Sequence, residues 1–196
     1  MAGLRARKKE QLRTTIQREA LRLFTDRGYE ATTVEEIAEA AGVSPATIYR
    51  YFTSKEDLVL TDEYDPIAIQ SLIERPADEP IIESVRVVMA GTFAKYIDRD
   101  REMLLARHAL LRRTPALQAA SFEEQERTLE LFSLLIARHL RRPANDLDVR
   151  IACGALSGAL KEAVGLWFEQ GAKGGETRIR ELINHAIDRV ESALRF

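Results

Sequence analysis

The sequence is poor in the residues on which several classes of protein depend. Cys153 is the only cysteine, so a disulfide within the chain is impossible and a reducing compartment fits. The three histidines, His108, His139 and His185, are scattered without paired metal-ligand spacing, so we expect no metal site and no cofactor. Charges interrupt the apolar runs before the roughly 18 residues that a membrane helix needs, and no apolar stretch follows the N-terminal charges. These absences favour a cytoplasmic protein without a membrane span.

The charge of the chain is nearly balanced overall but not locally. The formal net charge is -2, which excludes a protein that is basic as a whole. Residues 1–27, in contrast, carry eight basic and three acidic side chains, a local charge of +5. A basic end on a slightly acidic chain indicates a local site for a polyanion. The basic residues are Arg5, Arg7, Lys8, Lys9, Arg13, Arg18, Arg22 and Arg27.

Apolar residues recur at helical spacing along almost the whole chain, and no convincing alternating strand occurs. Leu12, Ile16, Ala20 and Leu23 follow one face of a first helix, which Gly28 ends. The fold class is therefore all-α, with residues 1–54 as a small three-helix head and residues 55–196 as a larger helical body. Proline and glycine breaks place the later helices. These are predicted over about 55–73 (interrupted at Asp65-Pro66), 80–99, 101–113, 116–141, 146–170 and 176–195.

Within the head, two short helices are predicted on either side of a tight turn. Thr33 is followed three residues later by Glu36, which is the signature of a capping box at the start of a helix. Gly42 ends that helix. Ser44 caps the next one, and Pro45 occupies its first position, where a missing N–H costs nothing. Two short helices joined in this way are typical of a helix-turn-helix.

The second of these helices has an outward face suited to DNA. Ile48 is four residues before Phe52, so both should point into the head, while Ala46 and Arg50 face outward, flanked by Thr47 and Tyr49. Small, hydroxylated and cationic side chains at the start of a helix fit the major groove. Two tyrosines and a lysine nearby can contact phosphates. In isolation the stretch SPATIYRYF is equally consistent with an ordinary helix whose aromatics pack on a neighbour.

The stretch ATTVEEIAEAAGVSPATIYRYFTSKEDLV resembles the DNA-binding head of TetR-family transcriptional regulators, and the resemblance covers about a quarter of the chain. It follows the family pattern from Phe24 and Gly28-Tyr29 to Lys55 and Leu58. The resemblance implies a core of Ile37, Val43, Ile48 and Phe52. It also implies operator contacts, to which helix geometry adds Arg50. The predicted DNA-binding residues are Thr33, Ser44, Pro45, Ala46, Thr47, Tyr49, Arg50, Tyr51 and Lys55.

The last two helices are predicted to form a homodimer. The C-terminal helix has one apolar stripe, whereas IACGALSGALKEAVGLWF is apolar on nearly all sides and rich in small residues, so it must be covered on more than one side. The family resemblance implies a four-helix bundle made by two copies, and a two-fold axis predicts a pseudo-palindromic operator. Alternatively, the stripe packs only internally. The predicted interface comprises Ala152, Ala155, Leu156, Ala159, Ile179, Leu182, Ile183, Ala186, Ile187 and Val190.

The middle of the body is predicted to hold a small apolar effector. Core packing explains each of its apolar residues taken singly, but the family usually encloses a pocket there, and methionine and aromatic side chains suit an apolar ligand. The run KEDLVLTDEYDP and the body after it resemble the mycofactocin-type regulators, which implies an acyl-CoA-like effector. The candidate pocket residues are Met89, Phe93, Tyr96, Met103, Arg107, His108, Leu111, Phe122, Phe132 and Trp167.

The favoured interpretation is a ligand-responsive repressor that is released from DNA by its effector. A thioester-handling helical enzyme is one alternative, and an architectural DNA-binding protein without an effector is another. The residues give the enzyme little support: Cys153 is expected to be an inert packing thiol, and GAKGG at 171–175 lacks the strand that a phosphate loop needs. The acidic residues Asp62, Glu63 and Asp65 are expected to be a solvated helix end rather than a cation site.

Overall fold

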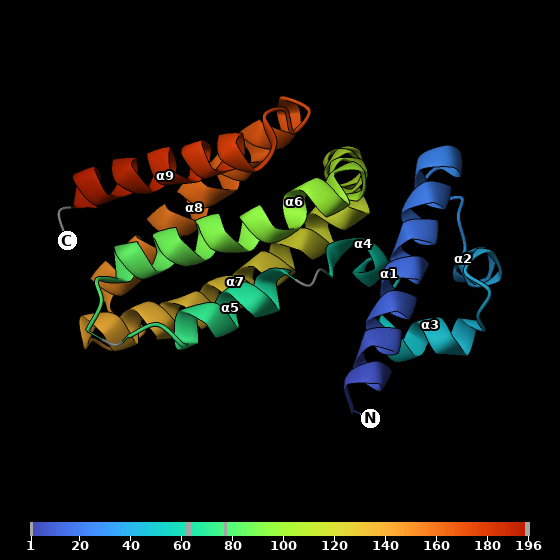
Figure 1. The fold of residues 1–196 in the computed structure, drawn as a ribbon, viewed down its shortest axis with the longest axis horizontal. Helices are drawn as coiled ribbons and strands as arrows, with labels where there is room; N and C mark the ends of the chain where they lie inside the picture. The colour runs from blue at the N-terminus through green and yellow to red at the C-terminus, as the bar shows by residue number, and fades with distance from the viewer. Residues whose placement is uncertain (1, 62–63, 77, 195–196) are drawn as a thin grey trace. The chain divides into compact units, whose positions relative to one another are not determined.

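The computed structural model describes residues 2–61, 64–76 and 78–194, apart from the side chains of 2–6, 64–65, 92–99 and 194. In these ranges every regular element is a helix, which confirms the all-α fold class (Figure 1). The elements are α1 (Ala2–Arg27), α2 (Val34–Ala40), α3 (Pro45–Tyr51), α4 (Asp57–Leu60), α5 (Tyr64–Ile73), α6 (Ile81–Arg113), α7 (Pro115–Leu140), α8 (Leu147–Glu169) and α9 (Gly175–Leu194).

Two predicted helix boundaries are wrong. The separate helices expected over 80–99 and 101–113 are the single helix α6, because residues 98–101 contain neither glycine nor proline to interrupt the backbone hydrogen bonds. The interruption expected at Asp65-Pro66 lies instead before Tyr64. Pro66 is tolerated in the first turn of α5, where backbone N–H groups have no helical acceptor.

The chain divides into two compact units, and the first comprises Met1–Asp62 and Glu102–Phe122. It is wider than the predicted 1–54 head, because the C-terminal part of α6 and the start of α7 belong to it. One hydrophobic core joins these segments: Ile16, Phe24 and Leu58 are buried beside Leu110 of α6 and Leu117 of α7. The long-range contribution of α6 and α7 to this core has no local sequence signal.

The predicted caps and core of the head are confirmed. The Thr33 hydroxyl accepts a hydrogen bond from the Glu36 N–H at 3.2 Å, and the Glu36 carboxylate accepts one from the Thr33 N–H at 2.8 Å. Ser44 caps α3 by accepting from the Thr47 N–H at 3.2 Å, with Pro45 in the first position. The predicted core residues Ile37, Ile48 and Phe52 are buried, and Val43 packs against them partly buried.

The second compact unit comprises Glu63–Arg101 and Glu123–Phe196, and within it α8 and α9 pack against each other along their length (Figure 1). The turn that joins them is closed by two backbone hydrogen bonds, from Ala172 to the Trp167 carbonyl and from Gly171 to the Phe168 carbonyl, both at 2.9 Å. Gly171 has a φ of 71°, which glycine adopts readily. The sharp reversal makes the two helices antiparallel neighbours.

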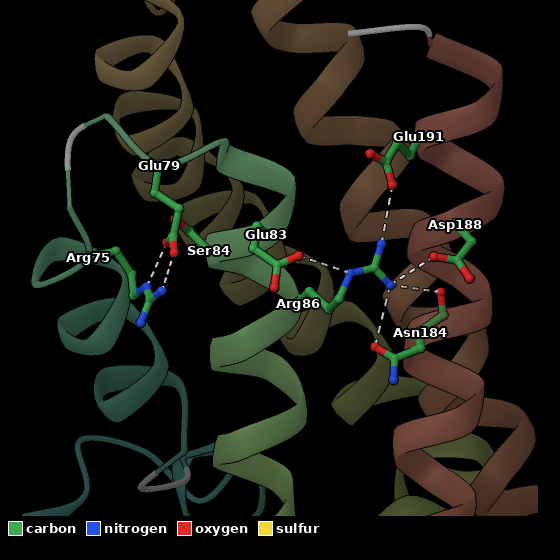
Figure 2. Close-up of polar contacts among 8 residues, drawn as sticks. All are labelled: Arg75, Glu79, Glu83, Ser84, Arg86, Asn184, Asp188 and Glu191. Carbon is green, nitrogen blue, oxygen red and sulfur yellow. Dashed lines mark hydrogen bonds and ion pairs between the residues drawn. The ribbon is translucent and has the colours of Figure 1, made fainter.

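Arg86 holds α9 against α6 (Figure 2). Its guanidinium lies 2.8 Å from the Asp188 carboxylate and 3.2 Å from the Glu191 carboxylate, and it also faces Glu83 at 3.5 Å on its own helix. It additionally donates to the backbone and side-chain oxygens of Asn184 at 3.5 Å. One cation therefore satisfies four side chains, three of which belong to α9.

A second polar cluster fixes the start of α6 (Figure 2). The Arg75 Nε donates to the Glu79 carboxylate at 2.7 Å, and the fully buried Ser84 hydroxyl donates to the same carboxylate at 2.5 Å. These hydrogen bonds from Arg75 and Ser84 hold the pKa of Glu79 below its usual range. The loop between α5 and α6 is thus tied to the first turn of α6.

Among the described residues, α8 is long and apolar enough to cross a membrane by length and composition alone, contrary to the sequence expectation. A core helix of a protein outside any membrane passes the same test. Val149, Leu156 and Trp167 on this helix are buried within the second unit. One side of α8 is therefore already covered by protein.

Candidate nucleic-acid interface

The exposed face of α3 is the centre of the candidate interface. Ala46, Tyr49 and Arg50 are exposed, and the Tyr49 side chain has 53% of its surface open to solvent. Ile48 and Phe52, on the opposite side, are 1% exposed and anchor the helix in the core of the first unit. A short helix held by its buried face presents the other face rigidly. This is the geometry required for a helix that enters a groove of DNA.

Three of the predicted contact residues also build the helix ends. The exposed hydroxyls of Thr33 and Ser44 are the N-caps of α2 and α3. The Thr47 hydroxyl lies 3.0 Å from the Ser44 hydroxyl, so the two share a hydrogen bond. A hydroxyl binds a phosphate oxygen through its O–H, so only the member of the Ser44–Thr47 pair that accepts in their shared hydrogen bond keeps a free donor, while the Thr33 hydroxyl donates to the Glu36 carboxylate at 3.3 Å. Pro45, between them in the sequence, is half-buried.

Tyr51 at the end of α3 is surrounded by cations. Its half-buried ring has the Arg50 guanidinium 5.4 Å and the Lys9 ammonium 5.9 Å from its centroid. The guanidinium of Arg13 lies 5.5 Å from the centroid of the neighbouring Phe52 ring. The structure therefore brings the basic N-terminal part of α1 to the C-terminal end of α3. The sequence showed the charge of this segment but not its position.

Lys55 has an internal role that the sequence prediction missed. Its ammonium donates to the Tyr29 carbonyl at 2.5 Å and lies 4.2 Å from the centroid of the Tyr29 ring and 5.6 Å from that of Phe24. The Tyr29 hydroxyl in turn donates to the Glu56 carboxylate at 2.7 Å. That hydrogen bond holds the pKa of Glu56 below its usual range, while burial and Glu56 raise the pKa of Tyr29. A phosphate contact by Lys55 stays a prediction.

The C-terminal end of α4 is tied to two other helices of the first unit. The Gln17 amide on α1 donates to the Thr61 carbonyl at 2.6 Å and to the Leu58 carbonyl at 3.4 Å. The Arg107 guanidinium on α6 donates to the Leu60 carbonyl. Carbonyls at the end of a helix lack partners in their own helix, so these side chains satisfy groups that would otherwise need water. Polar side chains far away in the sequence thus position α4, and no local pattern predicted them.

The residues predicted to line an effector pocket fall in both compact units. Met103 and Leu111 pack against the core of the first unit, where Arg107 binds the end of α4. Phe122 is 64% exposed, whereas Trp167 in the second unit is fully buried. Of the remaining candidates, Met89, His108 and Phe132 are half-buried, and the side chains of Phe93 and Tyr96 lie outside those that the structure describes.

The predicted dimer residues are largely buried within the single chain. This holds for the α9 residues Ile179, Ile183 and Ile187, which are buried in the single chain. Ala152, Leu156 and Val190 are buried as well, while Ala155, Ala159, Leu182 and Ala186 are half-buried. Other residues of α8 are exposed instead, and the sequence prediction omitted them. The exposed apolar and glycine residues of α8 are Leu147, Ile151, Gly154, Gly158 and Leu166.

The groups considered for other chemistry give no support for catalysis. Cys153 is buried, and burial raises the pKa of its thiol to about 11, so it is a poor nucleophile near neutral pH. Asp62 and Glu63 lie outside the described residues, as does the side chain of Asp65. Over the described ranges, His, Cys, Asp and Glu side chains form no group of three or more that could hold a metal ion.

Comparison with known proteins agrees with this geometry. Residues 16–61 match the family described as bacterial regulatory proteins, tetR family, and residues 79–195 match the MftR C-terminal domain. The HTH-type transcriptional regulator TcmR of Streptomyces glaucescens is 37% identical over 157 residues, which cover 74% of this chain and 66% of TcmR, just under two thirds of its length. The HTH-type transcriptional regulator BetI of Rhizobium meliloti is 32% identical over 193 residues, covering 90% of this chain and 86% of BetI.

A solved structure shares the fold. The transcriptional regulator FadR from Bacillus subtilis, in complex with stearoyl-CoA, superposes with a TM-score of 0.62 at 22% identity, over 90% of this chain and 96% of FadR. Both parts of the sequence resemblance are therefore confirmed, the family and the type of C-terminal domain. The chain belongs to the TetR family of transcriptional regulators, whose members bind operator DNA and dimerise, and its C-terminal domain is of the MftR type.

Proposed function

We propose that this protein is a cytoplasmic transcriptional repressor that binds a pseudo-palindromic operator as a homodimer and is released by a small apolar effector. The DNA-binding part of the proposal rests on the exposed face of α3, whose opposite side is fixed by the buried residues Ile48 and Phe52. Ala46 and Tyr49 are proposed to approach base edges, and their exposure on the outward side of the helix supports this. We propose that the hydroxyls of Ser44 and Thr47 donate to the phosphate backbone, and that the Thr33 hydroxyl does so in exchange for its hydrogen bond to Glu36.

The homodimer is proposed to form through the exposed face of α8. Gly154 and Gly158 lie four residues apart, in line with the exposed Ile151. A Cβ at either glycine would meet nothing within 4 Å in the single chain, so the chain's own packing does not require glycine there. Glycine inside a helix costs about 1 kcal/mol relative to alanine. A closely approaching helix from a second copy explains why that cost is tolerated.

The effector is proposed to be a fatty acyl thioester bound by the second unit. Two findings support this class: the MftR-type domain over residues 79–195 and the shared fold of B. subtilis FadR, which was solved with stearoyl-CoA. A ligand can shift the protein away from DNA only if it binds the DNA-incompetent arrangement more tightly than the competent one. Acyl-CoA and operator must therefore weaken each other's binding by the same factor.

The DNA-binding part is tested first with an operator selected from random duplexes. Tyr49→Phe removes the hydroxyl of an exposed residue and Thr47→Ala that of a half-buried one, while the buried residues Ile48 and Phe52 are unchanged. Both variants should bind the selected operator more weakly in an anisotropy titration while keeping the parental melting temperature. Lys173→Ala, an exposed lysine of the α8–α9 turn, is the matched control and should bind normally. Parental affinity in both α3 variants would refute the assignment of α3 as the reading helix.

The effector part is tested by thermal shift with acyl-CoAs of increasing chain length and with free CoA as the control. A ligand present at one hundred times its Kd stabilises the folded state by about 2.7 kcal/mol, which is a visible rise in Tm. Stabilisation that grows with chain length, together with release of operator at the same concentrations, supports the proposal. Trp167 is the only tryptophan, so its fluorescence is a second readout inside the second unit. A flat series would remove acyl thioesters as effectors and leave the DNA-binding proposal standing.

A further inference from the structure

The inward face of α1 changes its chemistry along the helix. Ile16 and Ala20, four residues apart, are completely buried in the core of the first unit. One turn earlier, Leu12 continues this face partly buried against the core, and Arg13 and Lys9 lie beside it. Arg13 is half-buried and Lys9 is exposed. Two cations therefore flank the apolar stripe of α1 near its N-terminal end.

These two cations lie at the end of the proposed reading helix. The Lys9 ammonium stands 5.9 Å from the centroid of the Tyr51 ring, and the Arg13 guanidinium stands 5.5 Å from that of Phe52. Arg50, exposed on α3, lies over the same Tyr51 ring at 5.4 Å. Aromatic rings attract cations through their faces, so this arrangement gathers three positive charges at one end of α3.

No carboxylate neutralises this cluster within the part of the chain that the structure describes. Neither Lys9 nor Arg13 has an ion-pair partner there, whereas Arg22 and Arg27, in the C-terminal half of α1, have carboxylates at 2.9 and 3.1 Å. Like charges held close together repel one another. The positive charge at the N-terminal end of α1 is therefore available to an anion from outside the chain, whereas the charge at the other end is paired within it.

We infer that Lys9 and Arg13 form a second DNA contact, which binds the phosphate backbone beside the groove entered by α3. The inference rests on the proposed operator binding. It adds a surface that carries no base information, because an ammonium and a guanidinium on phosphates do not distinguish sequences. An anionic membrane also offers phosphates, but only DNA would engage this cluster and the outward face of α3 in the same complex. DNA is therefore the partner that the arrangement favours.

The test needs no knowledge of the operator. The full-length protein is titrated onto a labelled duplex of mixed sequence at salt concentrations from about 50 to 200 mM, and the logarithm of affinity is plotted against the logarithm of salt. Each lost phosphate contact reduces the steepness of this plot by about 0.9 on B-DNA. The double variant Lys9→Gln/Arg13→Gln should therefore lose about 1.8. The single variant Lys9→Gln, at an exposed position, should lose about 0.9 and serves if the double variant fails to fold.

The matched control is Arg18→Gln/Arg22→Gln, which removes the same charge from exposed positions on the other side of α1. It should keep the parental slope. Equal losses in both double variants, or no loss in either, would overturn the inference and leave operator binding by α3 intact. Binding to anionic vesicles that Lys9→Gln/Arg13→Gln abolishes, with an unchanged slope on DNA, would also overturn it and assign the cluster to a membrane. Parent protein that binds no duplex would sink the proposed function and this inference together.

Discussion

Lys55 could stabilise the first unit from within or bind a DNA phosphate. The variant Lys55→Met distinguishes these two roles, because methionine removes the charge but keeps most of the apolar stem. In the structure the ammonium donates to the Tyr29 carbonyl at 2.5 Å and stands over the Tyr29 ring at 4.2 Å. A hydrogen bond to a charged group contributes about 1.5–3 kcal/mol. A cation–π contact at a partly exposed site adds about 0.5–1 kcal/mol. With Lys55 half-buried, the lower ends of these ranges apply, and we expect a loss of about 2 kcal/mol.

Urea unfolding of the full-length protein measures this loss. The variant should unfold at a lower urea concentration than the parent. The slope of its unfolding free energy against urea should be unchanged, because unfolding exposes the same amount of surface in both proteins. Lys173→Met removes an exposed lysine from the second unit and should leave the midpoint unchanged. Salt-dependent titration onto mixed-sequence DNA is run on the same samples and reports any lost phosphate contact.

The structural role predicts a stability loss with an unchanged salt slope. A phosphate role predicts the reverse: a parental urea midpoint and a slope reduced by about 0.9. The second result would show that the ammonium does not hold the Gly28–Tyr29 turn in solution. It would refute the argument that this lysine is committed to the interior of the first unit.

Three further predictions concern stability and assembly. The hydrogen bond from Tyr29 depresses the pKa of Glu56 from its usual 4.5, so it stabilises the fold above that pH and this contribution is lost as the pH falls through the lowered pKa. Tyr29→Phe should therefore narrow the difference in urea midpoint between neutral and acid pH. If the urea midpoint of Tyr29→Phe varied with pH as it does in the parent, the Tyr29–Glu56 hydrogen bond would not be a source of the pH dependence of stability. Gly158→Leu fills the exposed face of α8 and should yield monomers in sedimentation velocity, whereas a parental dimer would place the interface elsewhere. Arg86→Met should cost about 1 kcal/mol, since the carboxylate partners on α9 are half or more exposed, while Arg127→Met at a wholly surface pair should cost almost nothing. Equal urea midpoints for the two arginine variants would show that Arg86 does not hold α9 in place.

Local chemistry was readable from the sequence because it depends on residues a few positions apart. The capping box of Thr33 and Glu36 and the cap of Ser44 with Pro45 define the two short helices, and both are present in the structure. The burial of Ile48 and Phe52 follows from their spacing of four residues. These features determined the helix-turn-helix, and hence the family, without any long-range information.

Only the tertiary structure decided what each side chain meets across the fold. The inward turn of Lys55 depends on Tyr29, which is 26 residues earlier in the chain. By periodicity the stripe of α9 could cover a second copy or its own chain, and only the structure shows that its residues are buried where α9 packs against α8. The position of Lys9 beside Tyr51 likewise required α1 and α3 to be brought together. Periodicity specifies which face of a helix is apolar or charged, whereas the identity of the partner on that face depends on contacts that no local pattern encodes.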